Sequence, residues 1–299
     1  MSVQILMSTY NGAKYLKDQI DSILQQDYSD LQLFIRDDGS TDETPGILST
    51  YAKQNTRISY ITEQNAGVVI SFFELIKKAD DSNEWFAFSD QDDVWLSCKI
   101  SKALELMSGY DSAVPLLYCS NKIVTDEQLN PVSQQIKEYV KQPSFGNALV
   151  QNICTGCTCL FNRELLKILR MQIPQYVIMH DWWLYLTASC FGTVVYDCNS
   201  YILYRQHKHN VWGTKKTYLE LFKYRIGQLF CSRGLIYEQA KSFDACFHID
   251  KEKRLLLDLL IQSQHSLWKR FKLLINPYIY RQKKSDSLIY RFVQLIGKL

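Results

Sequence analysis

The sequence lacks the features of several common classes of protein. No apolar run approaches the roughly 18 residues that a helix needs to span a bilayer, and residues 1–7 contain no basic residue, so a secretory signal is not expected. No G-x-G-x-x-G pattern follows the first apolar segment, which argues against a dinucleotide-dependent dehydrogenase. We also find no internal repeat and no low-complexity linker. We therefore expect a cytoplasmic protein that is either soluble or peripheral on the inner face of the cell membrane.

A large net charge is missing too, but the charge is unevenly distributed. The formal net charge is +3, which gives no reason to expect a nucleic-acid partner. Residues 251–299 nevertheless contain 11 Lys and Arg against 3 Asp and Glu, so this segment carries +8 and the rest of the chain −5. Two interpretations of the basic segment stay open: a solvated helical face, and a contact with an anionic membrane surface.

The nine cysteines are an odd number, and without an export signal they are best interpreted as reduced thiols. Cys154, Cys157 and Cys159 cluster with C-x-x-C spacing. A structural zinc site usually needs four ligands, so we interpret these three as small buried side chains.

Short apolar segments alternate with amphipathic ones in the first half of the chain. The expected strands are residues 3–7, 31–36, 58–61, 85–89 and 116–120. The expected helices are residues 15–24, a helix after the capping-box pattern of residues 40–43, and residues 68–78. This alternation predicts an α/β fold with a mainly parallel, Rossmann-like central sheet flanked by helices. Ligands of such sheets bind beyond the carboxyl ends of the strands.

The second half begins with a polar segment, residues 126–145, which predicts a long excursion or lid. The elements expected after it are a strand at 159–161, helices at 163–170 and from His180, and strands at 193–196 and 201–204. Beyond residue 213 only helical patterns remain. We therefore expect a catalytic domain of residues 1–213 and a helical, basic region of residues 214–299.

Three carboxylates directly follow the apolar strand of residues 85–89, in the segment Asp90-Gln91-Asp92-Asp93. Crowded anions are tolerable if a cation neutralises them, and hard carboxylate oxygens suit Mg²⁺ or Mn²⁺. Mg²⁺ is usually held by one or two carboxylates plus substrate phosphates, which fits a D-x-D loop. The alternative is an acidic turn that caps a helix beginning near Val94. If Asp92 is a metal ligand, Asp93 is the member expected to cap that helix.

Other polar turns are expected at the same edge of the sheet. Residues 8–12 follow the first strand, Arg36 and Asp38 flank the end of the second, and Asn65 lies in a third turn. Taken singly, each is also explained by helix capping or ordinary turn chemistry.

The three segments Ser8-Thr9-Tyr10-Asn11-Gly12, Asp37-Asp38-Gly39-Ser40-Thr41-Asp42 and Asp90-Gln91-Asp92-Asp93 together have the order and spacing of family 2 glycosyltransferases. Over roughly residues 1–213 the chain resembles that family. The resemblance implies a glycosyltransferase A-type fold with a helical C-terminal extension, and inverting transfer from a nucleotide sugar. It also implies a base grip by Thr9, Tyr10 and Asp38, a place near the ribose and sugar for Asp90, and metal ligation by Asp92. The full donor-binding set is then Thr9, Tyr10, Asn11, Arg36, Asp38, Asn65, Asp90, Gln91 and Arg205.

An acceptor side is expected where His180 and Asp181 begin a helix beside Trp182 and Trp183. Sugars bind well on aromatic faces, and a hydroxyl nucleophile needs a base to take its proton. An acidic residue in this region is the general base in the resembled family, so we assign that role to Asp181, with His180 in support. The alternative is a helix-capping Asp with core tryptophans.

Two further segments extend the resemblance. Gly156 and Cys157 precede a strand and resemble the acceptor-side segment of the family, although a tight turn explains them nearly as well. The pattern Arg205-Gln-His207-x-x-Asn210 resembles rhamnosyltransferase-like bacterial members, in which the His or a basic residue meets the metal or the diphosphate. A structural histidine is the alternative.

The expected function is transfer of L-rhamnose from dTDP-L-rhamnose to a hydroxyl of a cell-wall or capsular glycan, on a lipid-linked acceptor. A UDP-hexose donor would fit the same motifs, because small differences between sugars are decided by few contacts. The acidic cluster is also compatible with a Mg²⁺-dependent nucleotidyltransferase or phosphohydrolase, and the fold with a noncatalytic assembly protein.

Overall fold

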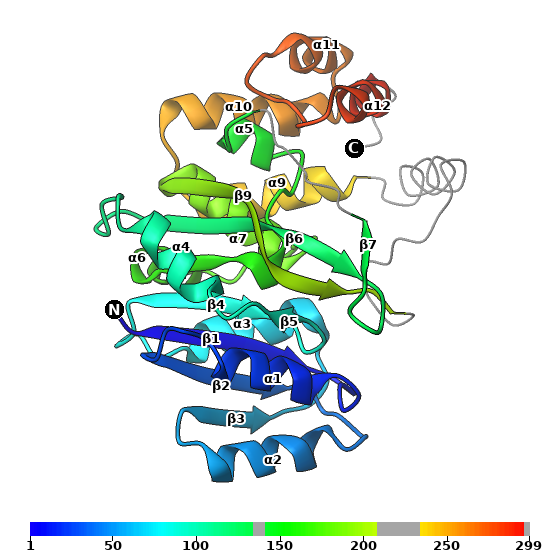
Figure 1. Cartoon of the computed structure of the whole chain (residues 1–299). Coiled ribbons are helices and arrows are strands. Elements are labelled where there is room, and N and C mark those ends of the chain that lie inside the picture. Colours follow the sequence, from blue (N-terminus) through cyan, green and yellow to red (C-terminus); the bar gives the residue numbers. More distant parts are fainter. Residues whose placement is uncertain (134–140, 208–233, 296–299) are drawn as a thin grey trace.

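One mixed β-sheet runs through this computed structural model, which describes residues 1–133, 141–207 and 234–295 (Figure 1). Its strands are β1 (Val3–Thr9), β2 (Leu31–Asp37), β3 (Ile58–Thr62), β4 (Trp85–Ser89), β5 (Val94–Trp95), β6 (Leu116–Thr125), β7 (Pro131–Ser133), β8 (Leu160–Asn162) and β9 (Thr193–Arg205). Their order is β3-β2-β1-β4-β8-β6-β9-β5, and β7 pairs with β6. Strands β1 to β4 are parallel, whereas β8 is antiparallel to β4 and β6. The fold is therefore the predicted α/β fold, with a sheet that is parallel only in part.

Helices cover both faces of the sheet because side chains alternate along its strands. They are α1 (Leu16–Leu24), α2 (Thr44–Gln54), α3 (Val68–Lys78), α4 (Lys99–Met107), α5 (Phe145–Ala148), α6 (Arg163–Met171), α7 (His180–Phe191), α9 (Leu235–Cys246), α10 (Lys251–Ser263), α11 (Leu267–Ile275) and α12 (Lys284–Leu295), with a 3₁₀ turn η1 (Gly156–Thr158). In β1, Val3, Ile5 and Met7 pack with α1, α2 and α4. Leu6 faces the other way, into the core shared by α3, α6 and α7.

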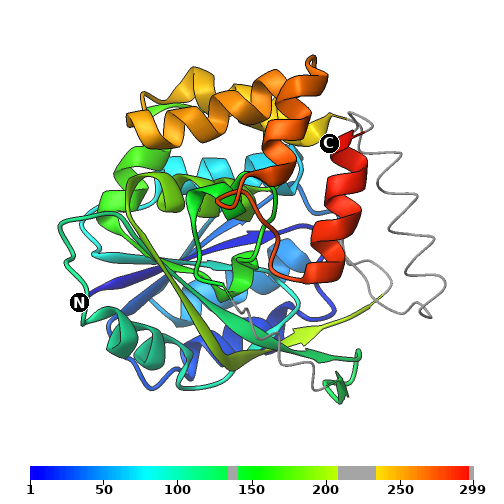
Figure 2. The same ribbon diagram turned by 90° about the horizontal axis from the view of Figure 1, so that it is seen from above.

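The C-terminal helices lie on the same side of the sheet as α3 and α7 (Figure 2). Tyr237 and Phe243 of α9 and Leu257 of α10 belong to the same hydrophobic core as Trp183 of α7. The predicted boundary after residue 213 falls outside the described residues, so the division into domains stays a prediction. Among the described helices, none combines the length and the apolar character that crossing a membrane requires.

Two predicted helix starts are wrong because tertiary contacts outweigh the local signals. Val94 begins the short strand β5, which pairs with β9, and the next helix starts only at Lys99. The capping box at residues 40–43 does not form, since the Ser40 hydroxyl donates to Asp37 at 2.5 Å and the helix begins at Thr44. The two short strands predicted at 193–196 and 201–204 are one strand, β9, because it pairs with β6 along its length.

Candidate active site

A cavity of about 1360 Å³ opens at the carboxyl ends of β1, β2 and β4. The predicted site residues that line it are Tyr10, Asn11, Asp38, Asn65, Asp90, Gln91, Asp92, Gly156, His180, Asp181, Trp182 and His207. Those that do not line it are Thr9, Arg36, Cys157, Trp183 and Arg205. The structure therefore gathers segments from both halves of the chain around one cavity.

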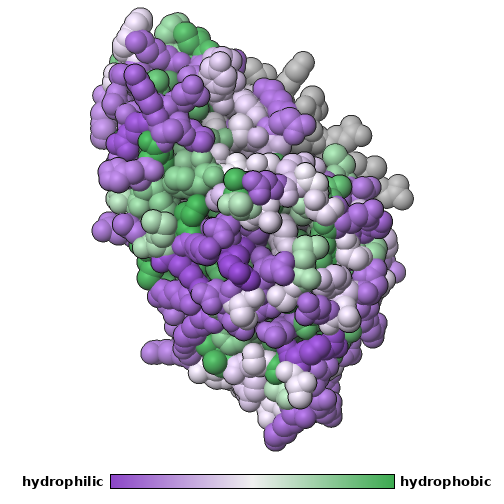
Figure 3. Space-filling model, turned by 90° about the vertical axis from the view of Figure 1, so that its left-hand side faces the viewer, coloured by the Kyte–Doolittle hydropathy of each residue, from purple (hydrophilic) through white to green (hydrophobic). Residues whose placement is uncertain are grey.

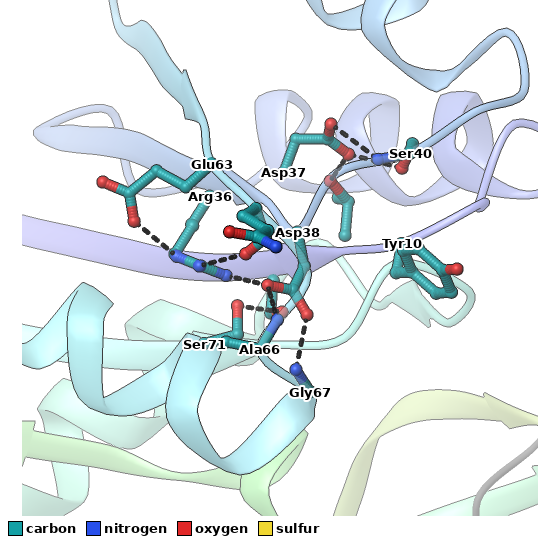
Figure 4. A network of polar contacts seen from close by, with 12 residues as sticks. Tyr10, Arg36, Asp37, Asp38, Ser40, Glu63, Ala66, Gly67 and Ser71 are labelled. Atoms are coloured by element: carbon teal, nitrogen blue, oxygen red, sulfur yellow. Dashed lines mark hydrogen bonds and ion pairs between the residues drawn. The ribbon is translucent and has the colours of Figure 1, made fainter.

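Asp38 stands at the end of β2 in a closed hydrogen-bond network (Figure 4). Its two carboxylate oxygens accept from the backbone N–H groups of Ala66 and Gly67, each at 2.9 Å, and the Arg36 guanidinium donates to it as well. Arg36 is 2% exposed and also donates to Glu63 at 3.1 Å. Arg36 thus orients Asp38 from behind, while Asp38 and Tyr10, whose side chain is 48% exposed, face the cavity.

Gln91 joins the ends of β1 and β4. Its amide accepts from Tyr10 N–H at 2.8 Å and donates to Tyr10 C=O at 3.0 Å. A Cβ at position 12 would lie 2.1 Å from the Gln91 side chain, so the approach requires Gly12. Asn11 has a φ of 46° and accepts from Thr41 N–H at 2.8 Å. Gln91 and Asn11 line the cavity, but their polar groups hold its loops together.

Asp90 and Asp92 present their carboxylates to the cavity from the loop after β4. Burial, and then the negative charges of Asp92 and Asp181, raise the pKa of Asp90 to about 7. Nε2 of His207 lies 2.7 Å from Oδ2 of Asp92, and the His207 ring packs on Tyr15 with centroids 4.8 Å apart. The structure therefore brings His207, which follows β9, next to Asp92 in the loop after β4. Asn210 lies outside the described residues.

Asp93 does not cap a helix, contrary to the prediction. It is 0% exposed, and its Oδ1 accepts from the backbone N–H of Arg205 at 3.0 Å, which fixes β5 to β9. Among the described residues, Asp90, Asp93 and Cys157 also bring one potential ligand atom each within 4.8 Å of one another. Burial, and then the negative charges of neighbouring carboxylates, raise the pKa of Asp93 and of the Cys157 thiol.

Arg205 is a structural residue of this site. Its Nε donates to the Asp92 carbonyl at 2.9 Å, Nη1 to the Glu127 carbonyl at 2.6 Å and Nη2 to Asp18 at 2.8 Å. The residue is 4% exposed. The predicted contact with a donor diphosphate is therefore replaced by a role in holding the acidic loop. Thr9, at 1% exposure, is likewise buried and donates to Asp37 at 3.0 Å.

Asp181 lies in the first turn of α7, too late to be the helix cap, which is Met179. Its Oδ2 accepts from Gly156 N–H at 3.0 Å, whereas its Oδ1 is buried without a hydrogen-bond partner among the described residues. Burial raises the pKa of Asp181 to about 6. The group is therefore mostly ionised at neutral pH and still basic enough to accept a proton.

The aromatic neighbours of Asp181 have separate roles. His180 stacks on Phe72 at 3.8 Å between ring centroids, and burial lowers its pKa to about 3, so it is neutral. Trp182 lines the cavity and donates its indole N–H to the Ala148 carbonyl at 2.7 Å. Trp183 is 0% exposed and packs edge-on against Phe243, so its predicted place on the acceptor side is wrong.

Besides Lys14, two cations that line the cavity were not predicted from the sequence, Lys122 and Arg281. Lys122 of β6 places Nζ 3.6 Å above the Tyr204 ring, and its charge acts to lower the pKa values of Asp90 and Asp181. Arg281, between α11 and α12, reaches the cavity and donates to the Val150 carbonyl at 3.2 Å. Lys122 reaches the cavity because β6 extends beyond the predicted strand of residues 116–120. Arg281 reaches it because the C-terminal segment docks beside it.

This sheet, with acidic groups after β4 and a second carboxylate on α7 in one cavity, has the architecture of a glycosyltransferase of the glycosyltransferase A type. The sequence profile described as "Glycosyl transferase family 2" matches residues 4–169. The chain belongs to this family.

A curated relative agrees with that assignment, and solved structures share the fold. The chain is 30% identical to "dTDP-rhamnosyl transferase RfbG" of Shigella flexneri over 237 residues, which are 74% of this chain and 78% of the relative. It is similar in structure to S. aureus TarS in complex with UDP-GlcNAc, with a TM-score of 0.59 at 18% identity over 93% of this chain and 77% of that one. It is also similar to the mannosyltransferase PcManGT from Pyrobaculum calidifontis in complex with GDP-Man and Mn²⁺, with a TM-score of 0.57 at 16% identity over 99% and 85%.

Proposed function

We propose that this glycosyltransferase is a metal-dependent, inverting enzyme that transfers L-rhamnose from dTDP-L-rhamnose to a hydroxyl of a lipid-linked cell-wall or capsular glycan. We place the reaction at the cytoplasmic face of the membrane. The observation that carries the proposal is the shared cavity of Asp181, with its unpartnered Oδ1, and the Asp90 and Asp92 carboxylates. The donor sugar is supported by the relative named as a dTDP-rhamnosyl transferase.

The residues present fit a divalent cation. Asp92 and His207 would hold it, in place of their mutual hydrogen bond, and the hard carboxylate oxygen of Asp92 suits Mn²⁺ or Mg²⁺. A cation also relieves the repulsion that raises the pKa of Asp90. When bound, it would neutralise the negative charge that develops on the departing diphosphate. The similar PcManGT structure contains Mn²⁺.

The chain's own groups account for the remaining steps. The acceptor hydroxyl gives its proton to the Asp181 carboxylate as its oxygen forms a bond to the anomeric carbon. The bond from that carbon to the diphosphate breaks, and the leaving group takes the electron pair. Gly156 N–H keeps Asp181 oriented, and Trp182 offers an aromatic face to the acceptor sugar. Lys122 adds positive charge to the cavity, close to the carboxylates of Asp90 and Asp181.

A donor screen tests this proposal directly. The melting temperature is measured with dTDP-L-rhamnose, dTDP, UDP, UDP-glucose and UDP-GlcNAc, each with Mn²⁺ or EDTA. A ligand at 100 times its Kd stabilises the native state by about 2.7 kcal/mol, so a bound donor gives a clear shift. We expect the largest shift with dTDP-L-rhamnose and Mn²⁺. A larger shift with the UDP sugars would replace the proposed donor by a UDP-hexose.

Arg281 is expected to recognise a phosphate of the acceptor. Its guanidinium lies beside the loop that carries Gly156, and charge-assisted hydrogen bonds contribute roughly 1.5–3 kcal/mol. Arg281→Gln should therefore raise KM roughly tenfold or more for a glycan on a diphosphate-linked alkyl chain, with KM for the donor unchanged. Exposed Lys283→Gln is the matched control. An equal loss with the same glycan on a neutral alkyl chain would contradict phosphate recognition.

A further inference from the structure

Helix α11 and the turn after it expose a continuous set of large apolar side chains. These are Leu267 (76% exposed), Trp268 (64%), Phe271 (52%), Ile275 (65%) and Tyr278 (69%), which we call the α11 face. Soluble proteins scatter exposed apolar residues singly, so such a concentration on one short helix indicates an interaction surface. At the upper end of the molecule, where Figure 1 places α10 and α11, Figure 3 shows hydrophobic side chains among hydrophilic ones.

Helix α11 is capped at its start and anchored by one buried side chain, while its outer face is exposed to solvent. The Ser266 side chain accepts from Lys269 N–H at 3.4 Å at the start of the helix, and Leu273, at 1% exposure, packs inward as the buried anchor. The exposed positions follow at helical spacing on the opposite side. Trp268 and Phe271 stack with ring centroids 6.2 Å apart, so two aromatic rings stand together on the outside.

The positive charge around the α11 face favours an anionic partner. Residues 259–285 contain six Lys and Arg and no Asp or Glu, and α11 itself carries Lys269, Arg270 and Lys272. A helix with an aromatic and aliphatic face flanked by basic residues is the pattern of helices that lie in the interface of an anionic bilayer. Each Lys or Arg near such a surface contributes about 1 kcal/mol, and Trp prefers the level of the headgroups.

The segment that follows α11 leads directly to the active site. The Tyr280 carbonyl accepts from the Asn147 side chain at 2.8 Å, and Gln282 N–H donates to Gln151 at 2.8 Å. A Cβ at position 146 would lie 2.0 Å from the Tyr278 carbonyl, so this close packing requires Gly146. Arg281, between these contacts, lines the cavity. The α11 face is therefore tied by a short docked segment to the wall of the cavity that carries Arg281 and Trp182.

We propose that the α11 face docks on a bilayer rich in anionic lipid and holds the cavity next to the membrane surface. Leu267, Trp268, Phe271 and Ile275 enter the headgroup region, while Lys269 and Lys272 contact lipid phosphates. The docking itself is independent of the donor sugar; only its benefit to catalysis rests on the proposed lipid-linked acceptor. A protein partner and a second copy of the chain are the competing occupants.

Co-sedimentation of the full chain with vesicles tests the docking. We expect binding to vesicles of phosphatidylglycerol and phosphatidylcholine, and at least about tenfold weaker binding to pure phosphatidylcholine. Trp268→Ser combined with Phe271→Ser should lower binding to the anionic vesicles about tenfold or more. The matched control is Met171→Ser combined with Ile173→Ser, which removes two apolar side chains of similar exposure (71% and 58%) on another surface and should bind as the wild type does.

Several outcomes would overturn the docking proposal. The first is that the wild type does not bind the anionic vesicles. The second is that the two double variants lose vesicle binding to the same extent. The third is that the wild type binds no lipid and is a dimer, which the α11 variant converts to monomers. The melting temperature and its shift with nucleotide and Mn²⁺ verify that the variants fold. Transfer to a water-soluble acceptor should be unchanged in the α11 variant, so a failure of docking is distinguished from a failure of the proposed enzymatic activity.

Discussion

Asp181→Asn should lower kcat by roughly 10²–10⁴-fold, the contribution usual for a positioned general base. KM for the nucleotide sugar should stay within about threefold of the wild-type value, because the variant removes an interaction that matters in the transition state rather than in donor binding. Asp81→Asn, a change at a carboxylate that is 73% exposed, is the control and should retain full activity. Near-wild-type turnover in Asp181→Asn would assign the base to another group.

The pH dependence supplies a second readout for the same residue. Burial raises the pKa of Asp181 to about 6, so the base is protonated, and kcat/KM falls, as the pH decreases through about 6. The same shift means that the ionised carboxylate opposes folding. The stability that the native state gains from the protonated carboxyl is lost as the pH rises from the ordinary Asp range through about 6. Asp181→Asn should therefore melt no lower than the wild type at pH about 7.5. A clear drop in melting temperature would indicate a mainly structural residue.

The strand ends that carry Asp38 and Asp90 were predictable from the sequence because their signals are local. Buried strands such as β1 and β4 appear as short apolar runs, and the amphipathic helices between them fix the parallel arrangement. The polar residues that follow must then gather at one edge of the sheet. The functional roles expected of these residues came from the resemblance of the segments to a known family. The spacing of apolar residues does not indicate such roles.

The predictions that failed depend on contacts between distant segments. The Asp93 carboxylate accepts a hydrogen bond from the backbone N–H of Arg205, 112 positions later in the sequence. The residues next to Asp93 in the sequence do not indicate this bond. Arg281 enters the cavity only because the segment after α11 docks against α5. Trp183 is buried because it packs against Phe243 of α9, 60 positions later, and no signal near Trp183 in the sequence indicates this contact.

Asp92→Asn is expected to abolish the part of nucleotide binding that depends on the divalent cation. The wild type should bind dTDP more tightly with Mn²⁺ than with EDTA, and the variant should bind equally weakly in both, because one charged ligand is lost from the pair formed with His207. An affinity loss of about 100-fold corresponds to roughly 2.8 kcal/mol and is measurable by titration calorimetry. The neighbouring Asp93→Asn is the matched comparison: its amide oxygen can still accept from Arg205 N–H, and it should leave the Mn²⁺ dependence in place. If Asp93→Asn instead removed the Mn²⁺ dependence and Asp92→Asn kept it, the cation would belong to the buried cluster of Asp90, Asp93 and Cys157, and the role given to His207 would be wrong.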